Sequence, residues 1–174
     1  MNSLHEKAGN VRLMAFDIDG VMTDGRLYFS PQGDEMKTFF SRDGLGLKML
    51  ARSGVKLAII TGRDSPIVTR RAENLGIELV FQGVEDKRGT MARLLDGEGL
   101  DFAQAGYMGD DVVDLGVMRA CGFSATVPDC HDSVRQIADY VAVAPAGAGA
   151  VREVCELLLR AQGNWDSTLA AYRS

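Results

Sequence analysis

Short, continuous apolar runs alternate with longer amphipathic stretches along most of the chain. A continuous apolar run is typical of a strand that is buried on both faces of a parallel sheet. Such runs predict strands at 11–16, 55–60, 77–81, 105–108 and 122–125, with an edge strand at 140–143. The intervening stretches predict helices at 43–52, 65–75, 86–95, 112–119, 131–138 and 151–162. Ser65 and Pro66 are expected as the N-cap and first residue of one helix, which Gly76 ends.

Strands that alternate with helices in this way predict an α/β fold with a doubly wound, Rossmann-like parallel sheet. All 174 residues are expected in one domain. A β-hairpin is predicted at 25–40 around a turn at 31–34, and a polar tail at 163–174.

Composition narrows the function classes. The net charge is −5, so a nucleic-acid surface is not the first expectation. No apolar stretch approaches the ~20 residues of a membrane span. The polar N-terminus, residues 1–10, lacks the apolar core of a signal peptide, and a cytoplasmic protein is therefore expected. Three widely spaced cysteines with no C-x-x-C indicate reduced thiols rather than a disulfide framework or a zinc site.

Polar residues follow the apolar runs at several points, and these residues are candidates for catalysis and metal binding. Asp17 and Asp19 follow the first strand, and Thr61 follows the second. Lys87 lies near the start of a predicted helix, and three acids follow a later strand, namely Asp110, Asp111 and Asp114. In doubly wound sheets, ligands bind beyond the carboxyl ends of the strands. Each signal alone is also typical of a turn, a helix cap or a surface charge, but their order on successive strand ends favours one site.

These residue types suit the hydrolysis of a phosphate monoester. Asp17 and Asp110 can offer oxygen ligands to Mg²⁺, and the cation would let an anionic carboxylate approach an anionic substrate. Asp17 would attack phosphorus to form an aspartyl-phosphate. Asp19 would protonate the leaving oxygen and later activate water. Thr61 would donate hydrogen bonds to a phosphate oxygen, and Lys87 would neutralise charge on Asp17 and the phosphoryl group.

Four segments resemble the four motifs of haloacid dehalogenase superfamily phosphatases. They are residues 17–21, residues 59–63, Lys87, and residues 109–111 with Asp114. Transport ATPases of that superfamily carry threonine at the position of Asp19, so this aspartate favours a phosphatase. Members often bury the site under a cap domain, but neither 19–61 nor 61–87 has room for one. The apolar hairpin either folds back on its own core or forms an oligomer interface.

A finer resemblance, over residues 11–162, is to the family of phosphatases that hydrolyse 3-deoxy-D-manno-octulosonate 8-phosphate. It is carried by residues 23–25, 42–44, 82–83, 86–87 and 149–157. The resemblance implies a role in lipopolysaccharide precursor synthesis and a homotetramer joined by its hairpins, whose C-terminal tails can close over a neighbour's site. It also implies that Mg²⁺ is held by Asp17, Asp110 and the backbone carbonyl of Asp19. The substrate contacts that it implies, in addition to Asp19, Thr61 and Lys87, are Phe40, Ser41, Arg42, Asp43, Gly44, Lys48, Gly62, Arg63 and Arg71.

Some positions depart from that family's pattern, and other functions stay open. Phe40-Ser41 stand where Asn-Val is usual, and Lys48 and Ala148 stand where arginine is common. A nonulosonate 9-phosphate phosphatase is an alternative, although it tends to carry glutamate at the position of Arg63. A receiver-type signalling module is a second alternative, although its phosphorylated aspartate follows the third strand. A phosphatase for macromolecules is a third, because an uncovered site would admit them.

Overall fold

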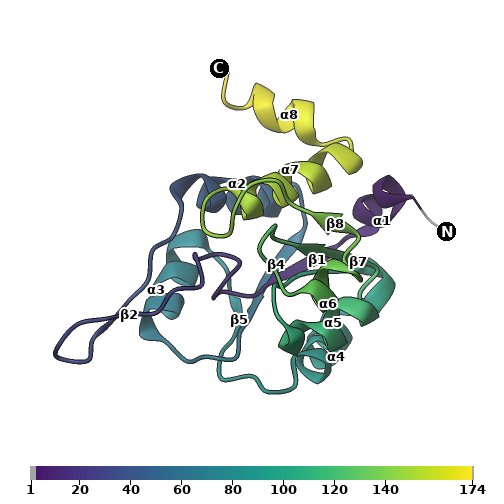
Figure 1. Cartoon of the computed structure of the whole chain (residues 1–174). Coiled ribbons are helices and arrows are strands. Elements are labelled where there is room, and N and C mark those ends of the chain that lie inside the picture. Colours follow the sequence, from purple (N-terminus) through teal and green to yellow (C-terminus); the bar gives the residue numbers. More distant parts are fainter. Residues whose placement is uncertain (1–2, 174) are drawn as a thin grey trace.

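Six parallel strands form the central sheet of the protein, which is described by a computed structural model over residues 3–173 (Figure 1). The strands lie in the order β5-β4-β1-β6-β7-β8. Their bounds are β1 (Leu13–Phe16), β4 (Lys56–Ile60), β5 (Leu79–Phe81), β6 (Ala105–Met108), β7 (Phe123–Thr126) and β8 (Tyr140–Val141). Phe16 pairs with Ile59 of β4 and Met108 of β6, so these three strands end at the same level of the sheet. The predicted α/β class is confirmed.

Helices cover both faces of this sheet (Figure 1). One face carries α2 (Ser41–Arg52) packed on α7 (Ala150–Ala161), with α1 (Leu4–Asn10) against α7 and α3 (Pro66–Leu75) beside α2. The other face carries α4 (Lys87–Glu98), α5 (Leu115–Ala120) and α6 (Asp132–Arg135). Two 3₁₀ turns are η1 (Phe102–Gln104) and η2 (Val112–Asp114). None of the helices within residues 3–173 combines the length and apolar character that crossing a membrane requires.

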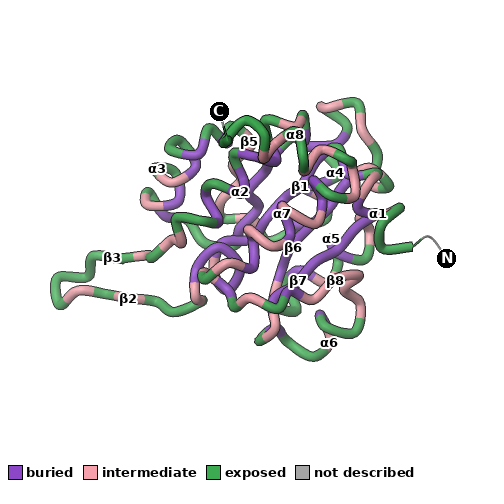
Figure 2. The backbone as a smooth tube through the Cα atoms, turned by 90° about the horizontal axis from the view of Figure 1, so that it is seen from above, coloured by how far each residue is buried: buried purple, intermediate pink, exposed green. Residues whose placement is uncertain are grey.

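The sheet forms the centre of the hydrophobic core (Figure 2). Every residue of β1, β6 and β7 is buried, including the polar Ser124 and Thr126 of β7, as is typical of central strands in a parallel sheet. Because β1 is hydrogen-bonded to a strand on each side, its last residue is fixed from two sides. The polar residues that follow β1 therefore start from a rigid support.

The predicted hairpin is present but has a short ladder. Strands β2 (Tyr28–Phe29) and β3 (Glu35–Met36) are antiparallel, with Tyr28 opposite Met36. The hairpin projects from the body of the protein, and most of its length is exposed (Figure 2). Leu27, Phe29 and Met36 keep 46%, 58% and 57% of their surfaces accessible, so the hairpin does not bury these side chains on its own core.

Both chain ends are more ordered than their polar sequences indicate. Ser3 and Glu6 form a capping box at the start of α1, a signature that the sequence contains. Within the expected polar tail, α8 (Trp165–Ala170) forms, and the Arg160 guanidinium lies 4.2 Å from the centre of the Trp165 ring. Met1, Asn2 and Ser174, which belong to the predicted polar ends, lie outside the described residues.

Two helix predictions differ in detail from the structure. Ser65 holds the N-cap position of α3, but its side chain makes no capping bond and instead donates to Glu35. Helix α6 is shorter than the predicted 131–138, because it ends at Arg135 and the backbone continues in turns to Ala138.

Candidate active site

The ends of β1, β4 and β6 open into one cavity of about 330 Å³. Five of the residues singled out for phosphate chemistry line it together, although they come from distant parts of the chain. The lining residues are Asp17, Asp19, Gly25, Leu27, Thr61, Gly62, Arg63, Lys87, Asp110, Asp111 and Val113.

The turn after β1 fixes the Asp17 carboxylate. The Asp17 N–H donates to the Met108 carbonyl at 3.0 Å, and the Asp17 Oδ1 atom accepts from the Ile18 N–H at 2.7 Å. Gly20 has φ +89°, and a Cβ there would come within 2.1 Å of the Asp110 Oδ2 atom. Only glycine fits, because the first-strand turn and the Asp110 loop pack backbone against side chain.

Lys87 links two acids at the floor of the cavity. It is the first residue of α4 and is only 3% exposed. Its Nζ lies 2.9 Å from Asp17 Oδ2 and 2.6 Å from Asp114 Oδ1. Burial alone would lower the pKa of Lys87, but the charges of Asp17 and Asp114 outweigh it and the pKa is raised. Lys87 is therefore a permanent cation next to the Asp17 carboxylate.

The structure separates the roles of two nearby acids that the sequence left unassigned. Asp114 is fully buried, and its Oδ1 accepts from Lys87 and from the Tyr107 hydroxyl at 3.0 Å. Its Oδ2 accepts the backbone N–H groups of Asp110 and Asp111. Asp111 is exposed and caps η2. Asp114 thus shapes the loop that carries Asp110, whereas Asp111 ends the loop at the surface.

Asp110 is poised for a cation. One oxygen each from Asp17, Asp110 and Asp114 lies within 4.8 Å of the others. The buried Asp110 Oδ1 has no hydrogen-bond partner among residues 3–173. Burial, followed by the charges of Asp17 and Asp114, raises the pKa of Asp110 to about 7, and burial also raises the pKa of Asp17. A hard divalent cation would lower both pKa values again, because its positive charge would stabilise the ionised forms of Asp17 and Asp110.

Asp19 has neighbours that the sequence did not predict. Lys37, from the residue after β3, places its Nζ 2.5 Å from Asp19 Oδ1. Arg63 Nε lies 3.6 Å from Asp19 Oδ2. No spacing or motif distinguishes Lys37 in the sequence, since its contact with Asp19 exists only once the hairpin folds back on the first-strand turn.

The remaining predicted substrate contacts lie away from this cavity. Phe40 and Arg42 line a second cavity of about 270 Å³ beside the start of α7. Asp43 is 2% exposed and accepts the Arg152 N–H at 2.8 Å, so one of its oxygens ties α2 to α7. The Arg71 guanidinium lies 5.3 Å from the centre of the Phe39 ring. The rest of this set is on α2, where Ser41 and Lys48 are exposed and Gly44 is buried.

Comparison with known proteins shows which family of enzymes this arrangement of residues belongs to. The 3-deoxy-D-manno-octulosonate 8-phosphate phosphatase of Haemophilus influenzae is 41% identical over 160 residues, which are 92% of this chain and 89% of the relative. The chain belongs to the 3-deoxy-D-manno-octulosonate 8-phosphate phosphatase family. No family model matches it.

Solved structures agree with this family. The Moraxella catarrhalis 3-deoxy-D-manno-octulosonate 8-phosphate phosphatase, in complex with magnesium, phosphate and the sugar acid, has a TM-score of 0.96 and 43% identity, covering 99% of both chains. A Legionella pneumophila structure described as a HAD superfamily (subfamily III A) hydrolase has a TM-score of 0.94 and 36% identity, covering 98% of this chain and 93% of that one. The predicted resemblance to haloacid dehalogenase phosphatases is confirmed. The site described above therefore lies in a member of the octulosonate phosphatase family.

Proposed function

We propose that the protein is a magnesium-dependent phosphatase that hydrolyses 3-deoxy-D-manno-octulosonate 8-phosphate to the free sugar acid and phosphate. The observation that carries this proposal is the convergence of Asp17, Asp19, Lys87 and Asp110 at one cavity in a member of this family. The reaction would serve lipopolysaccharide precursor synthesis in the cytoplasm.

Asp17 is the nucleophile in this proposal. A carboxylate oxygen of Asp17 attacks phosphorus while the bond from phosphorus to the sugar oxygen breaks, and Asp19 gives its proton to that oxygen. In the second step Asp19 takes a proton from water, the water oxygen attacks phosphorus, and the bond to Asp17 breaks. Thr61 and Lys87 hold the charge that develops on the phosphoryl oxygens.

Asp17, Asp110 and the backbone carbonyl of Asp19 would hold Mg²⁺. The Asp110 Oδ1 atom, which has no hydrogen-bond partner in the described part of the chain, and the raised pKa of both carboxyl groups fit this assignment. Asp114 fits less well as a ligand, because all of its contacts already go to Lys87, Tyr107 and two backbone N–H groups. When bound, Mg²⁺ supplies positive charge between the attacking carboxylate and the phosphate.

Arg63 would bind the anionic part of the substrate from within the cavity, where its side chain is 45% exposed. The other proposed contacts, Phe40 to Gly44 with Lys48 and Arg71, do not line this cavity. They would meet the substrate only if another subunit brought them to it. This separation supports the proposed homotetramer, with the exposed apolar residues of the hairpin as its interface.

The test is turnover of a substrate panel in Mg²⁺ by the full chain. The panel contains 3-deoxy-D-manno-octulosonate 8-phosphate, a nonulosonate 9-phosphate, simple sugar phosphates and a phosphopeptide. The octulosonate ester is expected to give the highest kcat/KM. A higher value for the nonulosonate ester would reassign the substrate, and preference for the phosphopeptide would indicate a macromolecular phosphatase. Light scattering in the same buffer is expected to give four times the chain mass of 18.8 kDa.

A further inference from the structure

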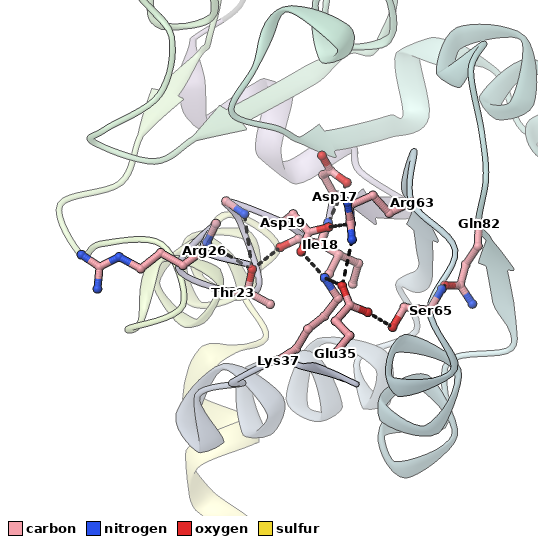
Figure 3. A network of polar contacts seen from close by, with 12 residues as sticks. Asp17, Ile18, Asp19, Thr23, Arg26, Glu35, Lys37, Arg63, Ser65 and Gln82 are labelled. Carbon is pink, nitrogen blue, oxygen red and sulfur yellow. Dashed lines mark hydrogen bonds and ion pairs between the residues drawn. The ribbon is translucent and has the colours of Figure 1, made fainter. Parts of the chain in front are cut away.

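The hairpin delivers a buried lysine to the active site. The Lys37 side chain is 1% exposed, and its Nζ contacts Asp19 Oδ1 at 2.5 Å and Glu35 Oε1 at 3.2 Å (Figure 3). A buried ammonium group is costly unless acids surround it. Lys37 therefore holds a specific position, in contrast to the exposed apolar side chains on the same hairpin.

Glu35 fastens this lysine to the rest of the site. Its Oε1 also accepts from Arg63 Nη2 at 3.0 Å, and its Oε2 accepts from the Ser65 hydroxyl at 2.7 Å (Figure 3). Ser65 is the N-cap residue of α3. The Ser65 hydrogen bond, followed by Arg63 and Lys37, holds the pKa of Glu35 below its usual range. The end of the hairpin is thus tied to the loop after β4 by contacts unrelated to strand pairing.

The two oxygens of Asp19 have different surroundings. Within residues 3–173, Oδ1 is engaged by Lys37, whereas Oδ2 has only Arg63 Nε at 3.6 Å, which is beyond hydrogen-bond reach. An acid that exchanges a proton with the leaving oxygen needs one oxygen free and the carboxyl group fixed in orientation. The contact at Oδ1 fixes the group, and Oδ2 is left for the proton.

We propose that Lys37 is a positioning residue that orients Asp19 for proton transfer to the leaving oxygen, with Glu35 holding Lys37 in place. This inference rests on the proposed phosphatase function. No extra reactant is needed, because the proton passes from Asp19 to the sugar oxygen as its bond to phosphorus breaks. The competing interpretation is that the Lys37 contacts only anchor the hairpin.

Substrates with different leaving groups separate these two interpretations. Nitrophenolate leaves without a proton, whereas the alkoxide of a sugar or of glycerol phosphate needs one. In the full chain with saturating Mg²⁺ and enzyme in excess, Lys37→Met is expected to lower the single-turnover rate of leaving-group release by at least about tenfold for the alkyl ester and by less than about threefold for p-nitrophenyl phosphate. Single turnover is used because the second step, in which Asp19 activates water, is common to both esters. An equal loss for both esters would show a general structural defect and overturn the inference, as would no loss for either.

Two further variants distinguish a specific effect of Lys37 from a general loss of folding. Lys37→Arg keeps the charge and the donor, and is expected to restore most of the alkyl-ester rate. Lys56→Met is the matched control, because Lys56 is a 52% exposed lysine paired with Glu98 at the opposite end of β4. It is expected to leave both rates unchanged, and a selective loss in this control would also count against the inference.

A double-mutant cycle keeps the inference testable if Lys37→Met reduces stability. In an Asp19→Asn background, Lys37→Met is expected to cause no further loss for the alkyl ester, because the residue that it orients is already inactive. Additive losses would overturn the inference. If wild-type protein hydrolyses glycerol phosphate but not the sugar-acid ester, only the proposed substrate fails and the cycle proceeds. If the wild-type protein hydrolyses neither ester class, both the proposed phosphatase function and the proposed role of Lys37 are wrong.

Discussion

Lys87 and Lys37 each place a buried ammonium group between two acids, but they reach the active site from very different supports. Lys87 begins α4 on the face of the central sheet and contacts Asp17 and Asp114. Lys37 follows the two-residue strand β3 of a projecting hairpin and contacts Asp19 and Glu35. The first-strand aspartates are therefore held by two different parts of the molecule.

The difference lies in what holds the partners of each lysine. Asp114 is fixed by the buried Tyr107 hydroxyl and by backbone N–H groups, so the surroundings of Lys87 belong to the core. Glu35 is fixed by Ser65 and by the half-exposed Arg63. Nucleophile and phosphate charge are thus preorganised by the sheet, whereas the orientation of the proton donor depends on the hairpin. Substitutions on the two sides should affect different steps.

The largest effect is expected at the nucleophile. Asp17→Asn removes the attacking oxygen charge, and kcat is expected to fall by at least about 10⁴-fold for alkyl and nitrophenyl esters alike. The protein should still fold, because an amide of the same shape keeps one acceptor oxygen for Lys87, although its NH2 group cannot also accept from the Ile18 N–H. The matched control is Asp96→Asn at an exposed position of α4, which should retain wild-type rates. Appreciable turnover by Asp17→Asn would refute its assignment as nucleophile.

Lys87→Met tests the core side of the site, meaning Lys87 with Asp17, Asp110 and Asp114; the hairpin side is Lys37 with Asp19 and Glu35. Loss of the cation next to the phosphoryl group is expected to raise the barrier by about 3 kcal/mol, or about 10²-fold in kcat, for both leaving groups. Equal loss for both esters is the opposite of the selective loss expected at Lys37. If Lys87→Met instead spared the nitrophenyl ester, the two lysines would serve the same step, and the division proposed here would be wrong.

Much of the core side was predictable from the sequence, for a physical reason. Asp17, Thr61 and Asp110 each follow an apolar run, and parallel strands bring their carboxyl ends to one edge of the sheet. The pattern could not separate Asp111 from Asp114, because two acids a single turn apart differ only in which one faces inward. The structure resolves this through the buried contacts of Asp114.

The hairpin side was not predictable in the same way. Lys37 meets Asp19 across 18 residues, and that contact depends on how the hairpin packs rather than on a local period. Helix α8 was missed because it is short and mostly polar: Trp165 and Leu169 form its small half-buried face, and the Trp165 ring lies against Arg160. Sequence patterns record burial and local geometry, whereas both of these features depend on individual tertiary contacts.

Magnesium binding should depend on pH through the core side alone. Burial, followed by the charges of Asp17 and Asp114, raises the pKa of Asp110 to about 7, and the cation needs the ionised carboxylate. The affinity for Mg²⁺ is therefore expected to rise by about tenfold per pH unit below 7 and to level off above it. Calorimetric titrations from pH 5.5 to 8.5 in buffers of different ionisation enthalpy would measure the affinity and the released protons.

Two variants make this magnesium test specific. Asp110→Asn should weaken Mg²⁺ binding and reduce its pH dependence near pH 7, because one of the two titrating ligands is gone while Asp17 remains. Lys37→Met should keep the wild-type pH dependence, because no proposed metal contact runs through its side chain. A pH-independent affinity in the wild-type protein would contradict the assignment of Asp110 as a ligand with a raised pKa.

The smallest effect is expected at Tyr107, which supports Lys87 from beneath. Its hydroxyl lies 3.0 Å from Asp114 Oδ1 and 3.1 Å from the Ile60 carbonyl, and the residue is fully buried in β6. Tyr107→Phe removes one hydrogen bond without creating a large cavity, so the free energy of unfolding should fall by about 1–2 kcal/mol. Because Lys87 and two backbone N–H groups still hold Asp114, kcat should fall only a few-fold and equally for both leaving groups. Chemical denaturation and steady-state rates measure the two effects. A loss confined to the alkyl ester would mean that Tyr107 acts on Asp19, and that the core and the hairpin are coupled more tightly than their separate contacts indicate.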